Sequence, residues 1–140
     1  MKQPLRPKLI SLPKIDDPRG NLTFFENESQ INFSIQRIFF TYDVPAQQRR
    51  GGHAYHQQNE LIVALSGSFD VVITYPEGSQ KKFSLNRPHS GLYIPAKIWR
   101  HLENFSTNAV SLHASDLSFD DNDYIRDFKH YVECSGHDGL

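Results

Sequence analysis

The side chains that could carry out chemistry are concentrated in residues 49–60, which read RRGGHAYHQQNE. Side chains two residues apart on a strand point to the same face, so we expect His53 and Tyr55 to lie together, with His56 pointing the other way. Imidazole and phenol groups both transfer protons, and the carboxylate of Glu60 can hold a neighbouring cation in place. The segment therefore predicts an acid–base site on the inner face of a β-structure.

Arginine side chains supply the positive charge that an anionic ligand would need. The chain has 15 Lys plus Arg against 16 Asp plus Glu, a net charge of -1, which excludes the broad attraction used by nucleic-acid or anionic-membrane binders. An inward arginine is costly to bury unless an anion pairs with it. We expect Glu60 to form a salt bridge with Arg50 or Arg100, and Arg100 to contact the substrate.

Short segments rich in β-branched and aromatic residues must position these groups. Turn signals separate most of the segments, which predicts an all-β sandwich or barrel. We expect a single domain over residues 1–140, with an ordered core at about residues 8–133. Residues 68–75 and 80–85 form the clearest hairpin. The other expected strands are residues 8–12, 21–25, 34–42, 60–65, 91–94, 98–103 and 110–113.

Only the C-terminal part of the chain has a helical pattern. Residues 120–123 supply capping oxygens, and Ile125, Phe128 and Val132 follow at helical spacing. We expect one helix on the outside of the barrel, with frayed ends at residues 1–7 and 135–140. Trp99 points outward by alternation and is expected at a dimer contact. Four histidines carry no motif and are expected to be structural or surface residues: His89, His113, His130 and His137.

Cysteine content and hydropathy limit which cellular compartment and which kinds of metal site fit this sequence. The single cysteine, Cys134, excludes an internal disulfide framework and a thiolate-rich metal site. The N-terminal residues lack the apolar core of a signal peptide, and the longest apolar run, residues 61–65, is too short to cross a bilayer. We therefore expect a reduced, cytoplasmic protein with no nucleic-acid or membrane partner.

The spacing of two segments matches paired motifs that hold a metal in some small β-barrels. The matching residues are His53, Tyr55, Glu60 and Gly67 in the first, then Pro95, Lys97, Arg100 and Asn104 in the second. With this spacing the chain resembles the cupin superfamily, and the resemblance implies a cupin-type jelly-roll barrel. Arg100 stands at a metal-ligand position, where a guanidinium cannot coordinate a cation and repels it. We therefore expect no catalytic metal.

Seven strings along the chain occur together in one family. They are RGGHA (50–54), LSGSFDVV (65–72), LNRP (85–88), GLYIP (91–95), IWR (98–100), ENFS (103–106) and DYIRD (123–127). With them the chain resembles, over about residues 17–131, the small bacterial nucleotide-sugar 3,4-ketoisomerases, which include the dTDP-4-keto-6-deoxyglucose 3,4-ketoisomerases and WxcM-like domains. The resemblance implies a homodimer with exchanged N-terminal strands that needs neither a metal nor another cofactor.

The resemblance also implies a reaction and a substrate. Family members move the keto group of a dTDP-linked 4-keto-6-deoxyhexose from C4 to C3, in making deoxysugars for surface glycans such as the O-antigen of lipopolysaccharide. This shift needs a base, a stabilised enediolate and a proton donor. We expect His53 to be the base and Tyr55 the acid or proton relay. The expected substrate contacts are Arg50, Arg100, Tyr93, Tyr42, Glu60 and Arg19.

Two positions depart from the family's pattern. The family commonly has His-Ala-His, with the second histidine taken as a shuttle or base, where this chain has Tyr55. A tyrosine donates a proton readily but is a poor base unless a nearby cation lowers its pKa. The family often has a tyrosine where Phe40 stands, and Tyr42 would share its face and compensate.

Other interpretations of these residues stay open. His53 and Tyr55 also fit hydrogen-bonded core residues, and Arg19 also fits a solvated turn residue. The departures at Tyr55 and Phe40 also fit a cupin that binds a nucleotide sugar or glycan without catalysis. A metal-dependent cupin is a third alternative, which Arg100 disfavours.

Overall fold

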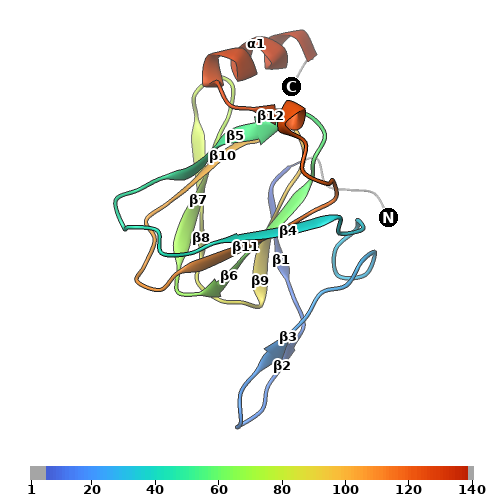
Figure 1. Ribbon diagram of the computed structural model, residues 1–140, viewed down its shortest axis with the longest axis vertical. Coiled ribbons are helices and arrows are strands. Elements are labelled where there is room, and N and C mark those ends of the chain that lie inside the picture. The colour runs from blue at the N-terminus through green and yellow to red at the C-terminus, as the bar shows by residue number, and fades with distance from the viewer. Residues whose placement is uncertain (1–5, 139–140) are drawn as a thin grey trace.

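Two five-stranded antiparallel sheets pack face to face, with one helix at the C-terminal end, in the computed structural model, which describes residues 6–138 (Figure 1). The predicted all-β fold with a single C-terminal helix is confirmed. The first sheet runs in the order β1 (Lys8–Ser11), β9 (Ser90–Ile94), β6 (Glu60–Ser66), β11 (Val110–Ser115) and β4 (Arg37–Thr41). The second runs in the order β12 (Tyr124–Ile125), β5 (Arg50–Tyr55), β10 (Trp99–Glu103), β7 (Phe69–Thr74) and β8 (Gln80–Leu85).

A two-stranded hairpin, β2 (Lys14–Ile15) and β3 (Leu22–Thr23), extends away from the two sheets (Figure 1). The strand expected at residues 21–25 is thus reduced to two residues, and the strand expected at 34–42 begins only at Arg37. The segment between them is irregular, and it supplies apolar side chains that cover the outside of the first sheet.

Strand β6 is buried on both faces. Ile62 and Ala64 point into the apolar cluster between the sheets, whereas Leu61 and Val63 point outward. The outward pair packs in a second cluster with Leu12, Ile31, Phe33 and Tyr93. Because both faces of this strand are apolar, its sequence is a continuous apolar run without alternation.

The C-terminal helix α1 (Phe128–Asp138) begins later than the sequence pattern predicts. The expected capping residues form a short 3₁₀ helix, η1 (Asp121–Asp123), and the chain then pairs with β5 as β12 before it becomes helical. The helix continues through residue 138, so residues 135–138 are not frayed, while residues 1–5 lie outside the described residues. No helix within residues 6–138 is long and apolar enough to cross a membrane.

Helix α1 covers the outer face of the second sheet, as predicted, and Trp99 lies beneath it. The Trp99 ring contacts Phe128 and Tyr131 at centroid distances of 5.2 and 5.6 Å. The expectation that Trp99 forms a dimer contact is therefore wrong, because the chain's own helix buries it to 9% exposure.

Backbone conformation explains two of the cupin motif positions. Gly67 has a φ of +64°, and a Cβ there would lie 2.9 Å from the Cα of Ala109, so both conformation and space require glycine. Lys97 stands where the second motif has glycine and also adopts a positive φ, of 67°. Its N–H donates to the carbonyl of Tyr55 at 2.7 Å, which ties this turn to the end of β5.

Gly67→Ala tests the packing at this turn, with Gly78→Ala as the matched control. Both glycines have positive φ, but a Cβ at Gly78 would meet nothing within 4 Å. We expect Gly78→Ala to lower the free energy of unfolding by about 1–2 kcal/mol through backbone strain alone. Gly67→Ala should lose about 1–3 kcal/mol more because the methyl group overpacks against backbone. Urea denaturation measures both, and equal losses would contradict this account.

Candidate active site

A cavity of about 500 Å³ lies between the two sheets, beside β12. It carries ionisable groups from four central strands. Strand β5 supplies Arg50, His53 and Tyr55, β6 supplies Glu60, β10 supplies Arg100, and β11 supplies His113. Basic, acidic and proton-transferring groups therefore face the same cavity.

Three rings meet on one wall of this cavity. The ring centroid of His53 lies 4.8 Å from that of Tyr55 and 5.1 Å from that of Tyr124, and the two tyrosine rings are 4.7 Å apart. The prediction that His53 and Tyr55 share a face of their strand is confirmed, and His56 is not among the lining residues. Gly51 has a φ of +73°, and a Cβ there would come within 3.4 Å of the His53 ring.

A buried salt bridge crosses the cavity from one sheet to the other. Arg100 Nη1 donates to Glu60 Oε1 at 2.9 Å, and the two side chains are 1% and 2% exposed. Arg100 Nε donates to the carbonyl of Ile98 at 3.1 Å, which fixes the plane of the guanidinium. The salt bridge predicted between Glu60 and one of two arginines is thus formed with Arg100. Pairing of β10 with β5 places Arg100 beside His53, its register partner.

Several buried polar atoms of the cavity wall have no hydrogen-bond partner among residues 6–138. They include the Tyr55 hydroxyl, Arg100 Nη2 and His113 Nδ1. The Arg100 guanidinium also lies 5.0 Å from the Tyr55 ring centroid, over its face. Because a buried polar atom without a partner is costly, these donors suit a polar ligand that enters the cavity.

Burial dominates the electrostatics of the two candidate acid–base residues. Burial, and then the positive charge of Arg100, lower the pKa of His53 to about 3, so its imidazole is neutral and free to accept a proton. Burial, and then the negative charge of Glu60, raise the pKa of Tyr55, so its hydroxyl stays protonated and can donate. The site therefore pairs a neutral base with a neutral acid.

The donor set at the four cupin ligand positions does not fit a divalent cation. Burial raises the pKa of Glu60, but His113 and Arg100 oppose it more strongly and hold the pKa at about 2, so the carboxylate is ionised. That carboxylate is already paired with Arg100, a guanidinium that cannot coordinate a metal and repels one. Among residues 6–138, no group of three or more His, Cys, Asp or Glu has a metal-binding arrangement.

Comparisons with known proteins agree with this geometry. The sequence model of a family described as "FdtA: WxcM-like, C-terminal" matches residues 6–136. The chain belongs to this WxcM-like family. It is 33% identical over 128 residues to the TDP-4-oxo-6-deoxy-alpha-D-glucose-3,4-oxoisomerase of Aneurinibacillus thermoaerophilus, in a match that covers 89% of this chain and 91% of that protein.

Solved structures of related proteins share the whole fold. The sugar 3,4-ketoisomerase QdtA from Thermoanaerobacterium thermosaccharolyticum, in complex with TDP, superposes with a TM-score of 0.93 at 29% identity, and the match covers 97% of this chain and 98% of QdtA. A 3,4-ketoisomerase from Helicobacter canadensis gives 0.89 at 32% identity, covering 93% and 97%. A histidine-to-asparagine mutant of QdtA was solved with TDP-4-keto-6-deoxyglucose, and it gives a TM-score of 0.93 at 28% identity with 99% coverage of both chains.

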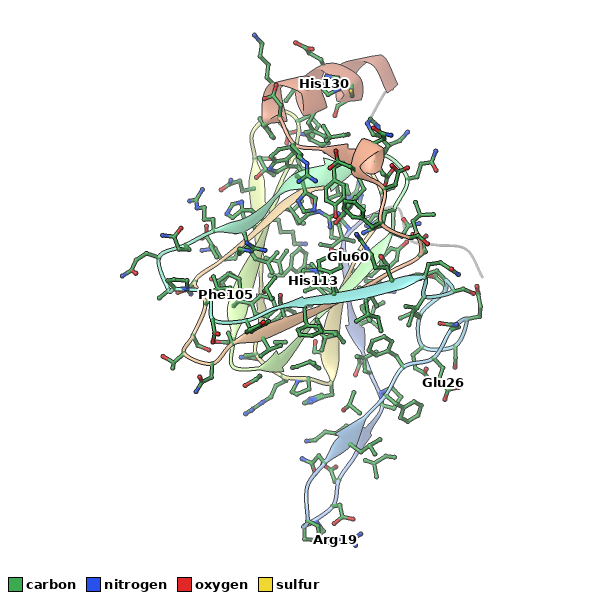
Figure 2. All side chains as sticks on the ribbon, viewed as in Figure 1. Arg19, Glu26, Glu60, Phe105, His113 and His130 are labelled. Carbon is green, nitrogen blue, oxygen red and sulfur yellow. The ribbon has the colours of Figure 1, made fainter. Side chains whose placement is uncertain are left out.

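Within one WxcM-like chain, three of the expected substrate contacts lie away from the cavity. Tyr93 is buried on the outside of the first sheet, with its ring 6.3 Å from Phe33, because both faces of β9 are covered. Tyr42 is 63% exposed on the outer side of the sheet. Arg19 lies at the tip of the β2–β3 hairpin, paired with Asp17 (Figure 2). None of the three lines the cavity of its own chain, and their contact with the substrate stays a prediction.

The position of Tyr42 follows from the direction of alternation on β4. Phe40 and Tyr42 do share a face, with ring centroids 6.1 Å apart, but this face is exposed. The residues of β4 that line the cavity are Phe39 and Thr41. Tyr42 therefore cannot replace a missing tyrosine inside the cavity of its own chain.

Sequence reasoning missed three ionisable residues of the cavity: His113, Tyr124 and Arg126. Tyr124 and Arg126 belong to the family string DYIRD, and the Arg126 guanidinium lies 4.1 Å from the Tyr124 ring centroid. His113 carried a usable signal, because Ser111, His113 and Ser115 put polar groups on one face of a strand whose other residues are apolar.

His53→Asn should flatten the dependence of stability on acid pH. The folded pKa of His53 is about 3 against an ordinary 6.5, so between these values the unfolded chain binds one proton that the folded chain does not. The free energy of unfolding therefore falls as pH falls through this window, by at most about 1.4 kcal/mol per pH unit from this group. Urea titrations at pH 6.5, 5.5 and 4.5 should show a shallower fall for the variant.

His130→Asn is the control, because His130 is exposed on α1 and is not among the residues that line the cavity (Figure 2). This control should keep the slope of the parent protein. An unchanged slope in His53→Asn would contradict a histidine that is buried in its neutral form.

Proposed function

We propose that this protein is a nucleotide-sugar 3,4-ketoisomerase acting on dTDP-4-keto-6-deoxy-D-glucose, and that it moves the keto group from C4 to C3 without a cofactor. The observation that carries the proposal is the convergence of His53, Tyr55 and Arg100 on one cavity, with the Tyr55 hydroxyl and Arg100 Nη2 lacking partners among the described residues. Membership of a family with relatives named 3,4-ketoisomerases supports it.

The reaction moves two protons and takes no electrons from outside the substrate. The C3–H bond breaks, and its electron pair becomes the C3=C4 double bond of an enediolate while the carbonyl pair moves to O4. The C4–H bond then forms, the carbonyl forms at C3, and the hydroxyl proton of O3 is transferred to O4. The site needs a carbon base, an oxyanion stabiliser and a group that exchanges hydroxyl protons.

Each need has a candidate residue. His53 accepts the C3 proton, and the enediolate's negative charge offsets the cost of forming an imidazolium beside Arg100. Arg100 Nη2 donates to the enediolate oxygen, since Nη1 is held by Glu60. Tyr55 gives its hydroxyl proton to O4 and takes one from O3, which suits a phenol that stays protonated.

The nucleotide diphosphate needs cations at the opening of the cavity. Arg50 and Arg126 both line the cavity and are exposed, so they can meet a dianionic group while it remains partly solvated. Planar guanidinium groups bind phosphate oxygens in a bidentate manner. We assign the diphosphate to this pair.

We also propose that the protein forms a homodimer in the cytoplasm. Apolar side chains on the hairpin and on β4 are more than half exposed, among them Ile15, Leu22 and Phe40. Exposed apolar surface of this kind is typical of protein–protein contacts. Because β1 pairs with β9 of its own chain, the exchanged part would be the β2–β3 hairpin, and its tip could bring Arg19 to the partner's surface.

Direct turnover tests the function. Purified protein treated with a chelator and given dTDP-4-keto-6-deoxyglucose in deuterium oxide should form the 3-keto isomer, followed by NMR. His53→Asn should lower kcat by about 10²–10⁴-fold because the base is lost. Tight binding without turnover in the parent protein would instead indicate a binding cupin, and full activity in His53→Asn would reject His53 as the base.

Tyr55→Phe tests the hydroxyl transfer separately. The substitution keeps the ring contacts with His53 and Tyr124 and removes only the unpartnered hydroxyl. We expect kcat to fall by about 10–100-fold, with little change in the thermal unfolding midpoint, because the packing of the ring is kept. An unchanged kcat would remove Tyr55 from the reaction.

A further inference from the structure

A second imidazole, that of His113, lines the cavity from the sheet opposite His53. His53 is on β5 of the second sheet, and His113 is on β11 of the first. His53 pairs in register with Arg100, while His113 Nδ1 lies 3.4 Å from Glu60 Oε1. The two imidazoles therefore flank the Glu60–Arg100 salt bridge from opposite walls; Figure 2 shows Glu60 and His113 close together in the interior.

The two ring nitrogens of His113 have different surroundings. Nε2 lies 2.9 Å from the Ser111 hydroxyl, which in turn lies 2.5 Å from the Thr41 hydroxyl on β4. Thr41 lines the cavity and is only half-buried, so this row of polar groups leads towards solvent. Nδ1 has no hydrogen-bond partner among the described residues, although it faces Glu60.

The ring is also held firmly. It stacks on Phe39 with a centroid distance of 4.4 Å and an interplanar angle of 10°, and the residue is 5% exposed. An imidazole can accept a proton at one nitrogen while it releases one from the other. A fixed imidazole between a cavity and a row of hydroxyls is therefore placed to carry protons between them.

We propose that His113 is a second acid–base residue of this site, which delivers to C4 a proton drawn from solvent through Thr41 and Ser111. The inference rests on the proposed isomerase function and deepens it. The polar groups around His113 are Glu60 from β6, Ser111 from its own strand and, across the cavity, Arg100 and His53.

His53 removes the C3 proton from one side of the sugar and later releases it to solvent. On the other side, His113 gives a proton from Nδ1 to C4, whose new bond uses the electron pair of the enediolate double bond. In the same step Nε2 takes a proton from Ser111, Ser111 takes one from Thr41 and Thr41 takes one from water, so the ring stays neutral. The hydroxide that remains is neutralised by the proton that His53 releases. The hydroxyl proton still moves from O3 to O4 through Tyr55.

The source of the hydrogen at C4, substrate or solvent, distinguishes one base from two. A single base that served both carbons would return part of the original C3 hydrogen to C4. With two histidines on opposite walls, the proton removed from C3 and the proton delivered to C4 pass through different residues. The wild-type product of a single turnover in deuterium oxide should therefore carry deuterium at C4.

His113→Gln is the test variant, because glutamine can hydrogen-bond to Ser111 and Glu60 but cannot carry a proton. We expect kcat to fall at least 10-fold with KM changed less than about threefold, since the lost group acts on the reacting carbon. We also expect the residual product to carry substrate-derived protium at C4, returned by His53. Phe39→Leu is the control, because it removes the stacked ring but keeps the row of polar groups, and it should leave deuterium at C4.

The outcomes separate the two proposals. A wild-type protein without isomerase activity would overturn the proposed function itself. An active wild type that puts protium at C4, or a His113→Gln variant with unchanged kcat and deuterium at C4, would overturn only the role of His113. If His113→Gln does not fold, Ser111→Ala interrupts the same route and should slow turnover and raise protium at C4; wild-type behaviour there would also overturn the inference.

Discussion

The salt bridge between Glu60 and Arg100 is the interaction on which the rest of the site depends. It joins the two sheets across the cavity, and both side chains are almost fully buried. Breaking a buried pair by removing one partner leaves an uncompensated charge and typically costs about 3–5 kcal/mol. The geometry of the pair therefore constrains the spacing of the sheets, and with it the position of each histidine beside one end of the bridge.

The surrounding structure keeps the site ready for a ligand. Tyr55 is held by its strand, by the turn at Lys97 and by the rings of His53 and Tyr124, yet its hydroxyl has no partner among the described residues. Donors fixed in advance towards the place where charge develops need no rearrangement during the reaction. A ligand that forms hydrogen bonds with these donors gains free energy on binding.

The sequence was informative wherever one face of a strand differed from the other. Alternation on β5 paired His53 with Tyr55, and the cost of burying Arg100 predicted its partner Glu60. Alternation alone could not say which face of β4 or β9 points inward, because both faces of each carry aromatic or apolar residues. The alternation of polar residues on β11 marked His113, but its surroundings needed the sheet order, since Glu60 beside it and Thr41 beside Ser111 belong to strands far away in the chain.

Arg100 has a consequence for the living cell. A bound metal ion is acquired after synthesis, and which ion enters a site depends on what the cell contains. The cation of this cavity is instead part of the polypeptide, present in every molecule from the moment it folds. Metal starvation cannot empty the position, and an excess of a competing ion cannot fill it with the wrong one. A cell short of iron or manganese would therefore still make molecules with a complete cation position.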